Sequence, residues 1–195
     1  MNAPDMPSRA GLKETEEGKR TPYRHPQPEY SPPEIVIPDA LPTDERLWVP
    51  QAENVWFRPL CLSASRGYWQ NLLRVRKSGV LSRHRHPQPV HGYVMRGSWR
   101  YLEHDWVATE GSYVYEAPGE THTLVVDEGV EEMITMFQVN GAMIYVDPDG
   151  RVSATRTCSP RSICASGISR RSAWEPLSSS ASSAEAAAAS CTKLE

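Results

Sequence analysis

The segment RHRHPQPVHG, residues 83–92, carries three of the six histidines of the chain. His84 and His86 are two residues apart, and on a β-strand such residues point to the same face, close enough to bind one metal ion. Taken alone, the pair could also be a polar feature of a strand surface. Further along, the segment EAPGETH, residues 116–122, places a Pro-Gly turn before His122, which starts another strand. Together the two segments predict a metal site made of His84, His86 and His122.

Short runs rich in Val, Tyr, Trp, Leu and Ile surround these histidines. They cover residues 54–61, 67–76, 90–96, 98–104, 111–116, 121–126, 132–139 and 142–146. Glycines separate many of the runs, and no amphipathic helix pattern is found between residues 54 and 149. Regularly spaced short strands with glycine turns are typical of an antiparallel sandwich or barrel rather than of βαβ units. The predicted fold class is therefore all-β.

The two histidine segments resemble the motifs of the cupin superfamily. The first motif, a glycine, His-x-His and a glycine at the next turn, is matched by Gly79, His84, His86 and Gly97. The second motif, a glycine followed by Pro-Gly-x-x-His, is matched by Gly111, Pro118, Gly119 and His122. One departure is that His91 stands where the family usually has a glutamate ligand. The resemblance covers about residues 54–148, and it implies a double-stranded β-helix, or jelly-roll barrel, that binds a metal ion.

Within this superfamily, residues 68–74, 83–103 and 114–122 resemble the family of 2,4'-dihydroxyacetophenone dioxygenases, and the ChrR-like cupin group shares the second motif. The resemblance implies an enzyme of aromatic degradation with a non-haem Fe2+ cofactor. It also implies that O2 is used to cleave an aromatic α-hydroxyketone between its two oxygenated carbons, which gives 4-hydroxybenzoate and formate. The histidine ligands by themselves would also accept Zn, Ni, Cu or Co.

Three further residues are candidates for catalytic roles. Glu116 could take the substrate's hydroxyl proton as a general base, or it could be an exposed turn carboxylate. Tyr101 could bond a substrate oxygen, or it could simply pack inside the barrel. His91 could be a fourth ligand, a partner that orients the ligands by hydrogen bonding, or a structural residue. We expect the orienting role, because a fourth imidazole would occupy a position that the substrate needs. Three neutral ligands would leave the metal its full charge, which favours an anionic, bidentate substrate.

Charge and hydropathy exclude several classes of partner. The 195 residues carry a formal net charge of -3, so no broad positive field indicates nucleic acid or an anionic membrane. No run approaches the ~20 apolar residues that cross a bilayer. Residues 1–20 are too polar for a secretory signal, so we expect a cytoplasmic protein. The expected partners are a small aromatic hydroxyketone and O2, and the resemblance implies a homo-oligomer.

The composition divides the chain into three parts. Residues 1–45 are rich in proline and indicate an extended arm, in which only residues 34–37 could form a strand. Residues 46–150 are the expected cupin domain. Residues 151–195 are rich in Ser and Ala and have two interpretations: a disordered tail, or an out-of-frame translation. In the second interpretation, the codons of Ser153 to Cys164 would permit a folded segment, VGYADVFTKIDM, in another frame.

Two other functions remain compatible with the sequence. One is a metal-binding sensor or regulatory cupin like those fused to anti-sigma factors, although the proline-rich residues 1–45 do not suit a helical partner-binding domain. The other is a different cupin oxygenase, or an isomerase, that uses the same three histidines. A metal-free storage cupin fits least, because the ligands are present.

Overall fold

A computed structural model describes residues 20–31 and 34–159, and the chain divides into two units, Met1–Pro32 and Pro33–Glu195. In the first unit, the rings of Tyr23 and His25 meet at 5.3 Å between centroids. The second unit holds all the strands described below. Most of the Ser/Ala-rich segment, residues 160–195, lies outside the described residues. Within the described ranges, no helix is long and apolar enough to span a membrane.

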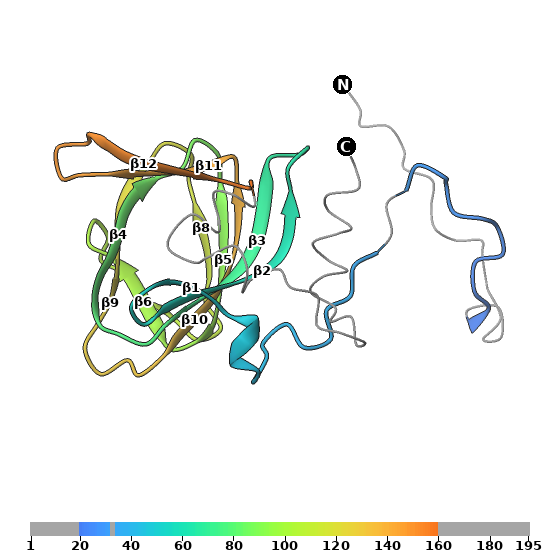
Figure 1. Cartoon of the computed structure of the whole chain (residues 1–195), viewed down its shortest axis with the longest axis horizontal. Coiled ribbons are helices and arrows are strands. Elements are labelled where there is room, and N and C mark those ends of the chain that lie inside the picture. The colour runs from blue at the N-terminus through green and yellow to red at the C-terminus, as the bar shows by residue number, and fades with distance from the viewer. Residues whose placement is uncertain (1–19, 32–33, 160–195) are drawn as a thin grey trace, which may run out of the picture. The chain divides into compact units, whose positions relative to one another are not determined.

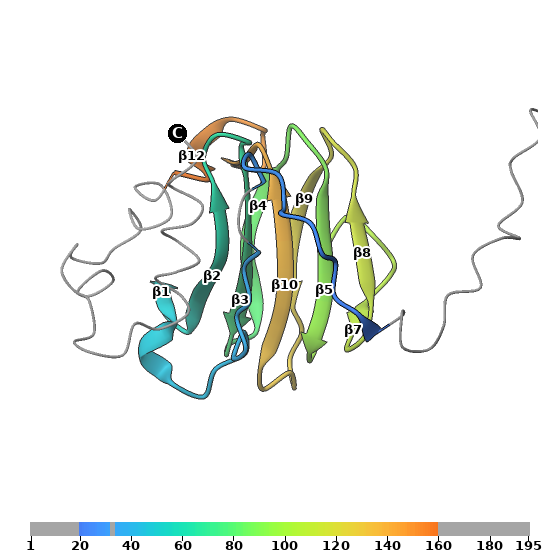
Figure 2. The same ribbon diagram turned by 90° about the vertical axis from the view of Figure 1, so that its right-hand side faces the viewer.

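Twelve strands and one short 3-10 helix make up the described part of the second unit. The helix is η1 (Glu45–Leu47), and the strands are β1 (Val49–Ala52), β2 (Val55–Ser63), β3 (Tyr68–Val75), β4 (Gly79–Arg85), β5 (Val90–Arg96), β6 (Ser98–Tyr101), β7 (Ala108–Thr109), β8 (Tyr113–Glu116), β9 (Thr121–Val126), β10 (Met133–Asn140), β11 (Ala142–Val146) and β12 (Val152–Thr157). They form two six-stranded sheets with the orders β1-β2-β3-β10-β5-β8 and β12-β11-β4-β9-β6-β7. Figure 1 shows the two sheets curving around a common interior, and Figure 2 shows the first sheet nearly face-on. The predicted all-β barrel is confirmed.

Each of the eight runs predicted as strands overlaps a strand of the structure. Residues 34–37 do not form one. The sheet also continues past Gly150, because β12 pairs antiparallel with β11 from Ala142↔Thr157 to Val146↔Val152. The first residues of the segment assigned to the tail are thus part of the second sheet. Its Val and Thr residues are β-branched and suit a strand.

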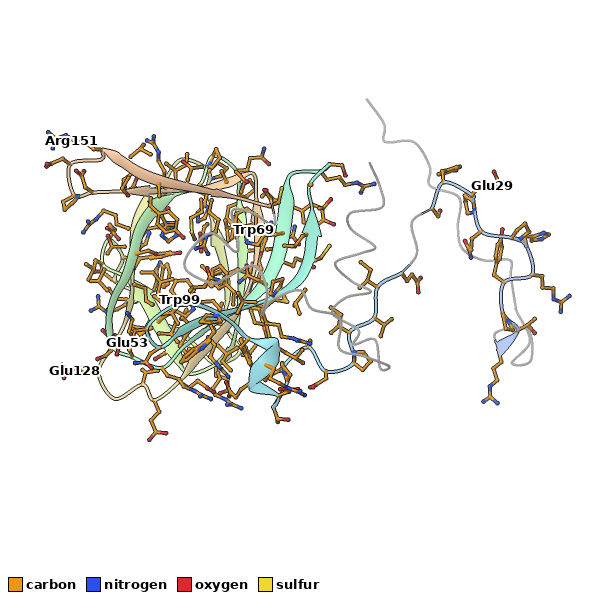
Figure 3. All side chains as sticks on the ribbon, viewed as in Figure 1. Glu29, Glu53, Trp69, Trp99, Glu128 and Arg151 are labelled. Carbon is orange, nitrogen blue, oxygen red and sulfur yellow. The ribbon has the colours of Figure 1, made fainter. Side chains whose placement is uncertain are left out.

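The core lies between the two sheets and follows the alternation of the strands. Val90, Gly92 and Val94 of β5 are buried, whereas His91 and Tyr93 between them are more exposed. Trp69 and Trp99 are almost fully buried and lie in the interior of the barrel, where the two sheets face each other (Figure 3). Inward-facing apolar residues of opposed sheets form such cores in sandwiches and barrels.

Gly97, part of the first histidine motif, forms the turn between β5 and β6. Its φ of 69° lies in the left-handed region that favours glycine. A Cβ atom here would come within 2.3 Å of the carbonyl oxygen of Glu132, a backbone atom that cannot move aside cheaply. Glycine is therefore required at this turn, both by the backbone conformation and by the lack of room for a side chain.

Residues just before β1 pack on the outer face of the first sheet, although the sequence placed part of this segment in the arm. The Arg58 side chain donates hydrogen bonds to the carbonyl oxygens of Asp39 and Ala40 at 2.8 and 2.9 Å. The Arg74 guanidinium lies 4.2 Å from the ring centroid of Trp48 and 4.5 Å from that of Trp56. It also donates to Glu45 of η1 at 2.9 Å. These contacts attach residues 39–48 to the barrel.

Replacing Arg74 by alanine is expected to lower the free energy of unfolding by about 2–3 kcal/mol. The side chain is 2% exposed, so the change removes two cation–π contacts and leaves a cavity between two tryptophans. Urea denaturation followed by tryptophan fluorescence measures the effect. Arg151→Ala is the control, since its side chain is 80% exposed and its removal should cost no more than about 0.5 kcal/mol. Equal stabilities of the two variants would contradict the structural role of Arg74.

Candidate metal centre

Two neighbouring strands of the second sheet bring the three predicted histidines together. His84 of β4 and His122 of β9 are direct partners in the antiparallel ladder, so both side chains point to the same face. His86 follows immediately after β4 and lies on that face as well, two residues from His84. The three imidazole rings meet with centroid distances of 4.7 to 5.6 Å. All three side chains are buried, with 1–2% exposure.

The first sheet contributes a carboxylate to the same cluster. Glu116 ends β8, opposite Val90 of β5, and its side chain points inward across the barrel. Its Oε2 lies 3.4 Å from Nε2 of His86 and 3.4 Å from Nε2 of His122. One possible ligand atom from each of His84, His86, Glu116 and His122 lies within 4.8 Å of all the others. The four groups together could hold a metal ion.

Hydrogen bonds orient two of the imidazoles. Nδ1 of His84 lies 3.0 Å from the hydroxyl of Ser82, and Nδ1 of His86 lies 3.1 Å from the carbonyl oxygen of Ala142. Each bond engages Nδ1 and leaves Nε2 for a metal ion, which is the usual way in which such partners set the ligating nitrogen. A hydrogen bond also holds the Pro-Gly turn next to His86, because the N–H of Gly119 donates to the carbonyl oxygen of His86 at 2.7 Å.

Tyr101 of β6 contacts two members of the cluster. Its hydroxyl donates to Oε1 of Glu116 at 2.7 Å, which turns Oε2 toward the imidazoles. Its ring also stacks on the His122 imidazole, with centroids 3.9 Å apart and the planes 9° from parallel. The phenol is therefore held by the carboxylate, and burial raises its pKa well above the ordinary value. Tyr101 fits the role of a residue that positions Glu116 and His122.

The protonation states suit a cation at the centre of the cluster. Burial lowers the pKa of His86 to about 4 and that of His122 to about 3, and it lowers the pKa of His84 as well. The imidazoles are thus neutral near pH 7, the form that ligates metals. Burial also raises the pKa of Glu116 to about 7. A nearby cation would favour its ionised form.

The cluster leaves buried polar atoms that a metal ion would satisfy. Oε2 of Glu116 and both ring nitrogens of His122 have no hydrogen-bond partner among the residues that the structure describes. Such atoms are costly in a protein interior unless they meet a donor, an acceptor or an ion. Three imidazoles and one carboxylate are a donor set that Fe(II), Zn, Ni, Cu and Co all accept. The residues present therefore fit a divalent transition metal.

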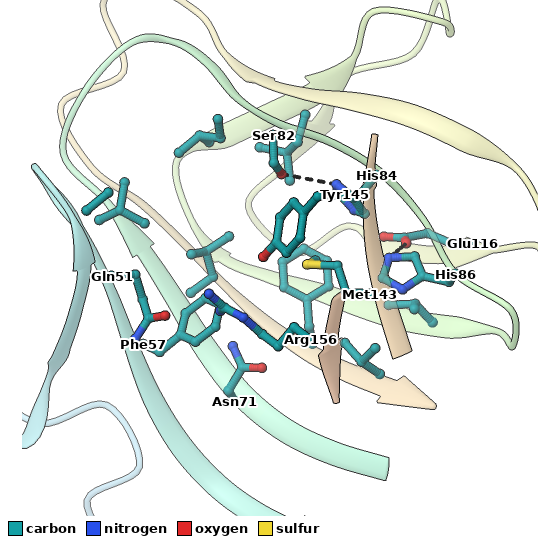
Figure 4. A pocket seen from close by; sticks show the side chains of 18 of the residues that line it. Gln51, Phe57, Asn71, Ser82, His84, His86, Glu116, Met143, Tyr145 and Arg156 are labelled. Carbon is teal, nitrogen blue, oxygen red and sulfur yellow. Dashed lines mark hydrogen bonds and ion pairs between the residues drawn. The ribbon is translucent and has the colours of Figure 1, made fainter. Parts of the chain in front are cut away.

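A cavity of about 270 Å³ opens beside the cluster and is lined by His84, His86, Tyr101 and Glu116. Most of the remaining lining is apolar or aromatic: Val55, Phe57, Trp69, Leu73, Leu81, Val90, Leu124, Phe137, Val139, Met143 and Tyr145. Figure 4 shows His84, His86 and Glu116 on one side of this pocket, and Asn71, Phe57 and Arg156 on the other. A small ligand with an apolar body could therefore reach the cluster.

Glu116 differs from its sequence-based expectation. It is not the exposed turn carboxylate that was one of the two expectations, because the side chain is 4% exposed and lies within the cluster. The general-base role stays a prediction. The expected site of three neutral ligands thus gains a carboxylate, which would lower the net charge of the metal site by one. Alternation along residues 113–116, which turns Val114 and Glu116 to the same face, was the signal that could have found it.

His91 lies outside the cluster, contrary to the expectation that it orients the ligands. It occupies an outward-facing position of β5, where its Nδ1 is 2.7 Å from the hydroxyl of Tyr113 and its ring contacts Tyr115. Neighbours on the inward face, Val90 and Gly92, are buried instead. The physical reason is the two-residue period of the strand, which puts His91 on the opposite face from these residues. The structure therefore gives His91 no contact with the candidate ligands.

Comparisons with known proteins agree with this fold. The family model described as a ChrR Cupin-like domain matches residues 38–144. A solved RmlC-like cupin protein from Ralstonia eutropha is 33% identical, with a TM-score of 0.53 over 57% of this chain and 73% of that one. A solved acetylacetone dioxygenase from Acinetobacter johnsonii shares the fold at 17% identity, with a TM-score of 0.57 over 69% of this chain and 92% of that one. No curated protein matches the sequence significantly.

Proposed function

Because this chain belongs to the family of ChrR cupin-like domains, we propose that it is an Fe(II)-dependent dioxygenase that cleaves an aromatic α-hydroxyketone. The observation that carries the proposal is the buried cluster of three imidazoles and one carboxylate beside a mainly apolar cavity. The fold is compatible with this chemistry, since a protein named as an acetylacetone dioxygenase shares it. The choice of iron and of substrate rests on the resemblance of residues 83–103 and 114–122 to the 2,4'-dihydroxyacetophenone dioxygenases.

The proposed substrate is 2,4'-dihydroxyacetophenone, a single aromatic ring that carries a hydroxyl and a hydroxyacetyl group. Its size suits a cavity of about 270 Å³, at the small end of ligand pockets. The C–C bond between the carbonyl carbon and the hydroxymethyl carbon breaks, and both atoms of O2 enter the products. One molecule of substrate and one of O2 give one molecule each of 4-hydroxybenzoate and formate, so the atoms balance.

His84, His86, His122 and Glu116 are the residues that would hold the iron. Bound Fe(II) would supply electrons to O2 and Lewis acidity to the two oxygens of the substrate. The protein's part is to orient these groups and to keep bulk water away. Ser82 and the carbonyl oxygen of Ala142 set two imidazoles, and Tyr101 sets the carboxylate and stacks on the third imidazole. We therefore assign Tyr101 a positioning role rather than a bond to substrate.

Turnover of the proposed substrate tests this function directly. The full chain is purified without oxygen, loaded with Fe(II) and mixed with 2,4'-dihydroxyacetophenone in aerated buffer. We expect equal molar amounts of O2 consumed, formate formed and 4-hydroxybenzoate formed. Metal-free protein and Zn-loaded protein are the controls, because zinc fills such sites but has no redox chemistry.

The same assay separates the alternatives. Acetylacetone is the second substrate, and its turnover in place of the hydroxyketone would assign a different ketone-cleaving oxygenase. Bound iron with neither substrate consumed would overturn the proposal and would favour the metal-sensing role.

A further inference from the structure

The cavity beside the metal cluster has polar groups at two separate places. Figure 4 shows Asn71 and Arg156 on the side away from His86 and Glu116, with Tyr145 and Met143 between them. Apolar side chains such as Trp69 and Phe137 line the remainder. We call the side formed by Asn71 and Arg156 the far end of the cavity. A ligand held at the cluster and extending through the apolar part would reach it.

Asn71 is a buried residue that lines the cavity. It lies on β3, faces the barrel interior and is 4% exposed. Among the described residues, no side-chain hydrogen bond to Asn71 is found, although the residue lines the cavity. An apolar ligand group that covered this amide would leave it unpaired, at a cost of about 1–3 kcal/mol. A polar ligand group at this place would avoid that cost.

Arg156 adds a positive charge to the same side of the cavity. It lies on β12 and is 9% exposed, with its guanidinium carbon 4.7 Å from the ring centroid of Phe57 and 5.9 Å from that of Tyr145. The two rings hold the guanidinium in place within the apolar wall. A positive charge in such a setting favours an anionic or strongly polar oxygen over an apolar group.

We propose that Asn71, assisted by Arg156, binds a hydroxyl or phenolate oxygen at the end of an aromatic ligand opposite the group held at the cluster. The cavity then selects aromatic rings that carry a hydroxyl at the end remote from the cluster, and it disfavours rings without that group. This inference deepens the proposed function, on which it rests for the group held at the cluster. It does not require turnover, because the far end consists only of protein side chains.

The selectivity arises because the loss of the ligand hydroxyl costs more binding free energy here than an added group costs in an apolar pocket. The Asn71 amide can accept a hydrogen bond from a phenol and donate one to its oxygen, whereas a ligand with hydrogen at this position leaves the amide buried and unpaired. A site built to pair with a hydroxyl rejects the analogue that lacks it more strongly than an apolar pocket rejects an added group. We therefore expect discrimination of about tenfold or more from this one contact.

Calorimetric titration of the full chain with 4'-hydroxyacetophenone and with acetophenone tests the proposal. Neither compound carries the α-hydroxyl of the proposed substrate, so binding is measured without the cleavage reaction. We expect the wild type to bind the hydroxylated compound at least about tenfold more tightly. Asn71→Leu should reduce that ratio of affinities to about twofold or less, mainly by lowering the affinity for the hydroxylated compound.

Gln70→Leu is the matched control. Gln70 precedes Asn71 on the same strand, but its amide faces outward and bonds Gln138 at 2.9 Å. This variant should keep the wild-type ratio. Asn71→Val serves as the second variant where the leucine disturbs folding, which circular dichroism and thermal unfolding check. Arg156→Met should lower the affinity for the hydroxylated compound alone.

An equal affinity of the wild type for both compounds, or an unchanged ratio in folded Asn71→Leu and Asn71→Val proteins, would overturn the inference. Failure of the proposed function would give a different result. The wild type would still prefer the hydroxylated compound and Asn71→Leu would still lose that preference, but iron-loaded protein would consume no O2 with 2,4'-dihydroxyacetophenone. With turnover, Asn71→Leu should raise the KM for that substrate about tenfold, and leave the KM for 2-hydroxyacetophenone within about twofold.

Discussion

His122→Ala protein is expected to lose its metal ion, with an affinity at least about 100-fold below the wild type. The imidazole of His122 is one of four donors in the cluster and is 1% exposed. Within the described part of the chain, neither of its ring nitrogens has a hydrogen-bond partner. Its removal leaves three donors in place of four, and hydrogen bonds to Ser82, Ala142 and Tyr101 hold these three in positions set by the complete cluster. His84→Ala should behave in the same way, since His84 lies directly opposite His122 in the ladder.

Metal content after anaerobic loading and desalting, measured by mass spectrometry, gives the first readout. Competition with a chelator gives the dissociation constant, and the visible absorption bands of Co(II)-loaded protein report the loss of a ligand without any need for turnover. His91→Ala is the control and should keep one metal ion per chain, because His91 bonds Tyr113 outside the cluster. Full metal occupancy in folded His122→Ala protein would refute the assigned ligand set.

Glu116→Gln is expected to weaken metal binding about 100-fold and to abolish most of the activity with it. The substitution preserves the shape of the side chain, and the amide oxygen can still accept the hydrogen bond from Tyr101, so the fold should persist. It removes the negative charge that faces two imidazoles at 3.4 Å. An amide oxygen is a much poorer ligand for a transition metal than a carboxylate.

This variant also separates the two roles considered for Glu116. A general base would leave metal content unchanged while kcat falls, whereas a ligand loses metal and kcat together. Glu120→Gln is the matched control, because Glu120 lies near the same turn but pairs with His104 at 2.7 Å. Wild-type metal affinity in Glu116→Gln protein would show that the carboxylate is not a ligand. The metal affinity of Tyr101→Phe protein should lie between those of the Glu116→Gln and Glu120→Gln proteins, with an intact fold. The substitution removes the hydrogen bond that orients the Glu116 carboxylate.

Much of this arrangement was predictable from local patterns. The eight apolar runs each overlap a strand, because their β-branched and aromatic residues and the glycines between them are local features of the sequence. His84 and His86 were placed on one face by the two-residue period of a strand, and the Pro-Gly turn put His122 at the start of its strand. Gly97 was recognised as a turn residue, and the structure adds the reason that a Cβ atom would meet the carbonyl oxygen of Glu132.

Other features depend on which surfaces meet after folding. Residues 39–45 were assigned to an extended arm, yet Arg58 and Arg74 hold them against the first sheet. The strand β12 was missed because its sequence carries little apolar content, and pairing with β11 provides its stability. Neither feature has a local periodic signature.

The sequence by itself determined most of the strands, their turns and the three histidines of the second sheet, because each depends on neighbours a few residues apart. Only the tertiary structure decided that Glu116 joins these histidines and that His91 does not. Glu116 belongs to the opposite sheet, and its carboxylate reaches the imidazoles only when the two sheets face each other across the barrel. That same packing turns the Asn71 amide toward the cavity. Strand periodicity states which side chains share a face, whereas the composition of the site follows from which faces are packed together.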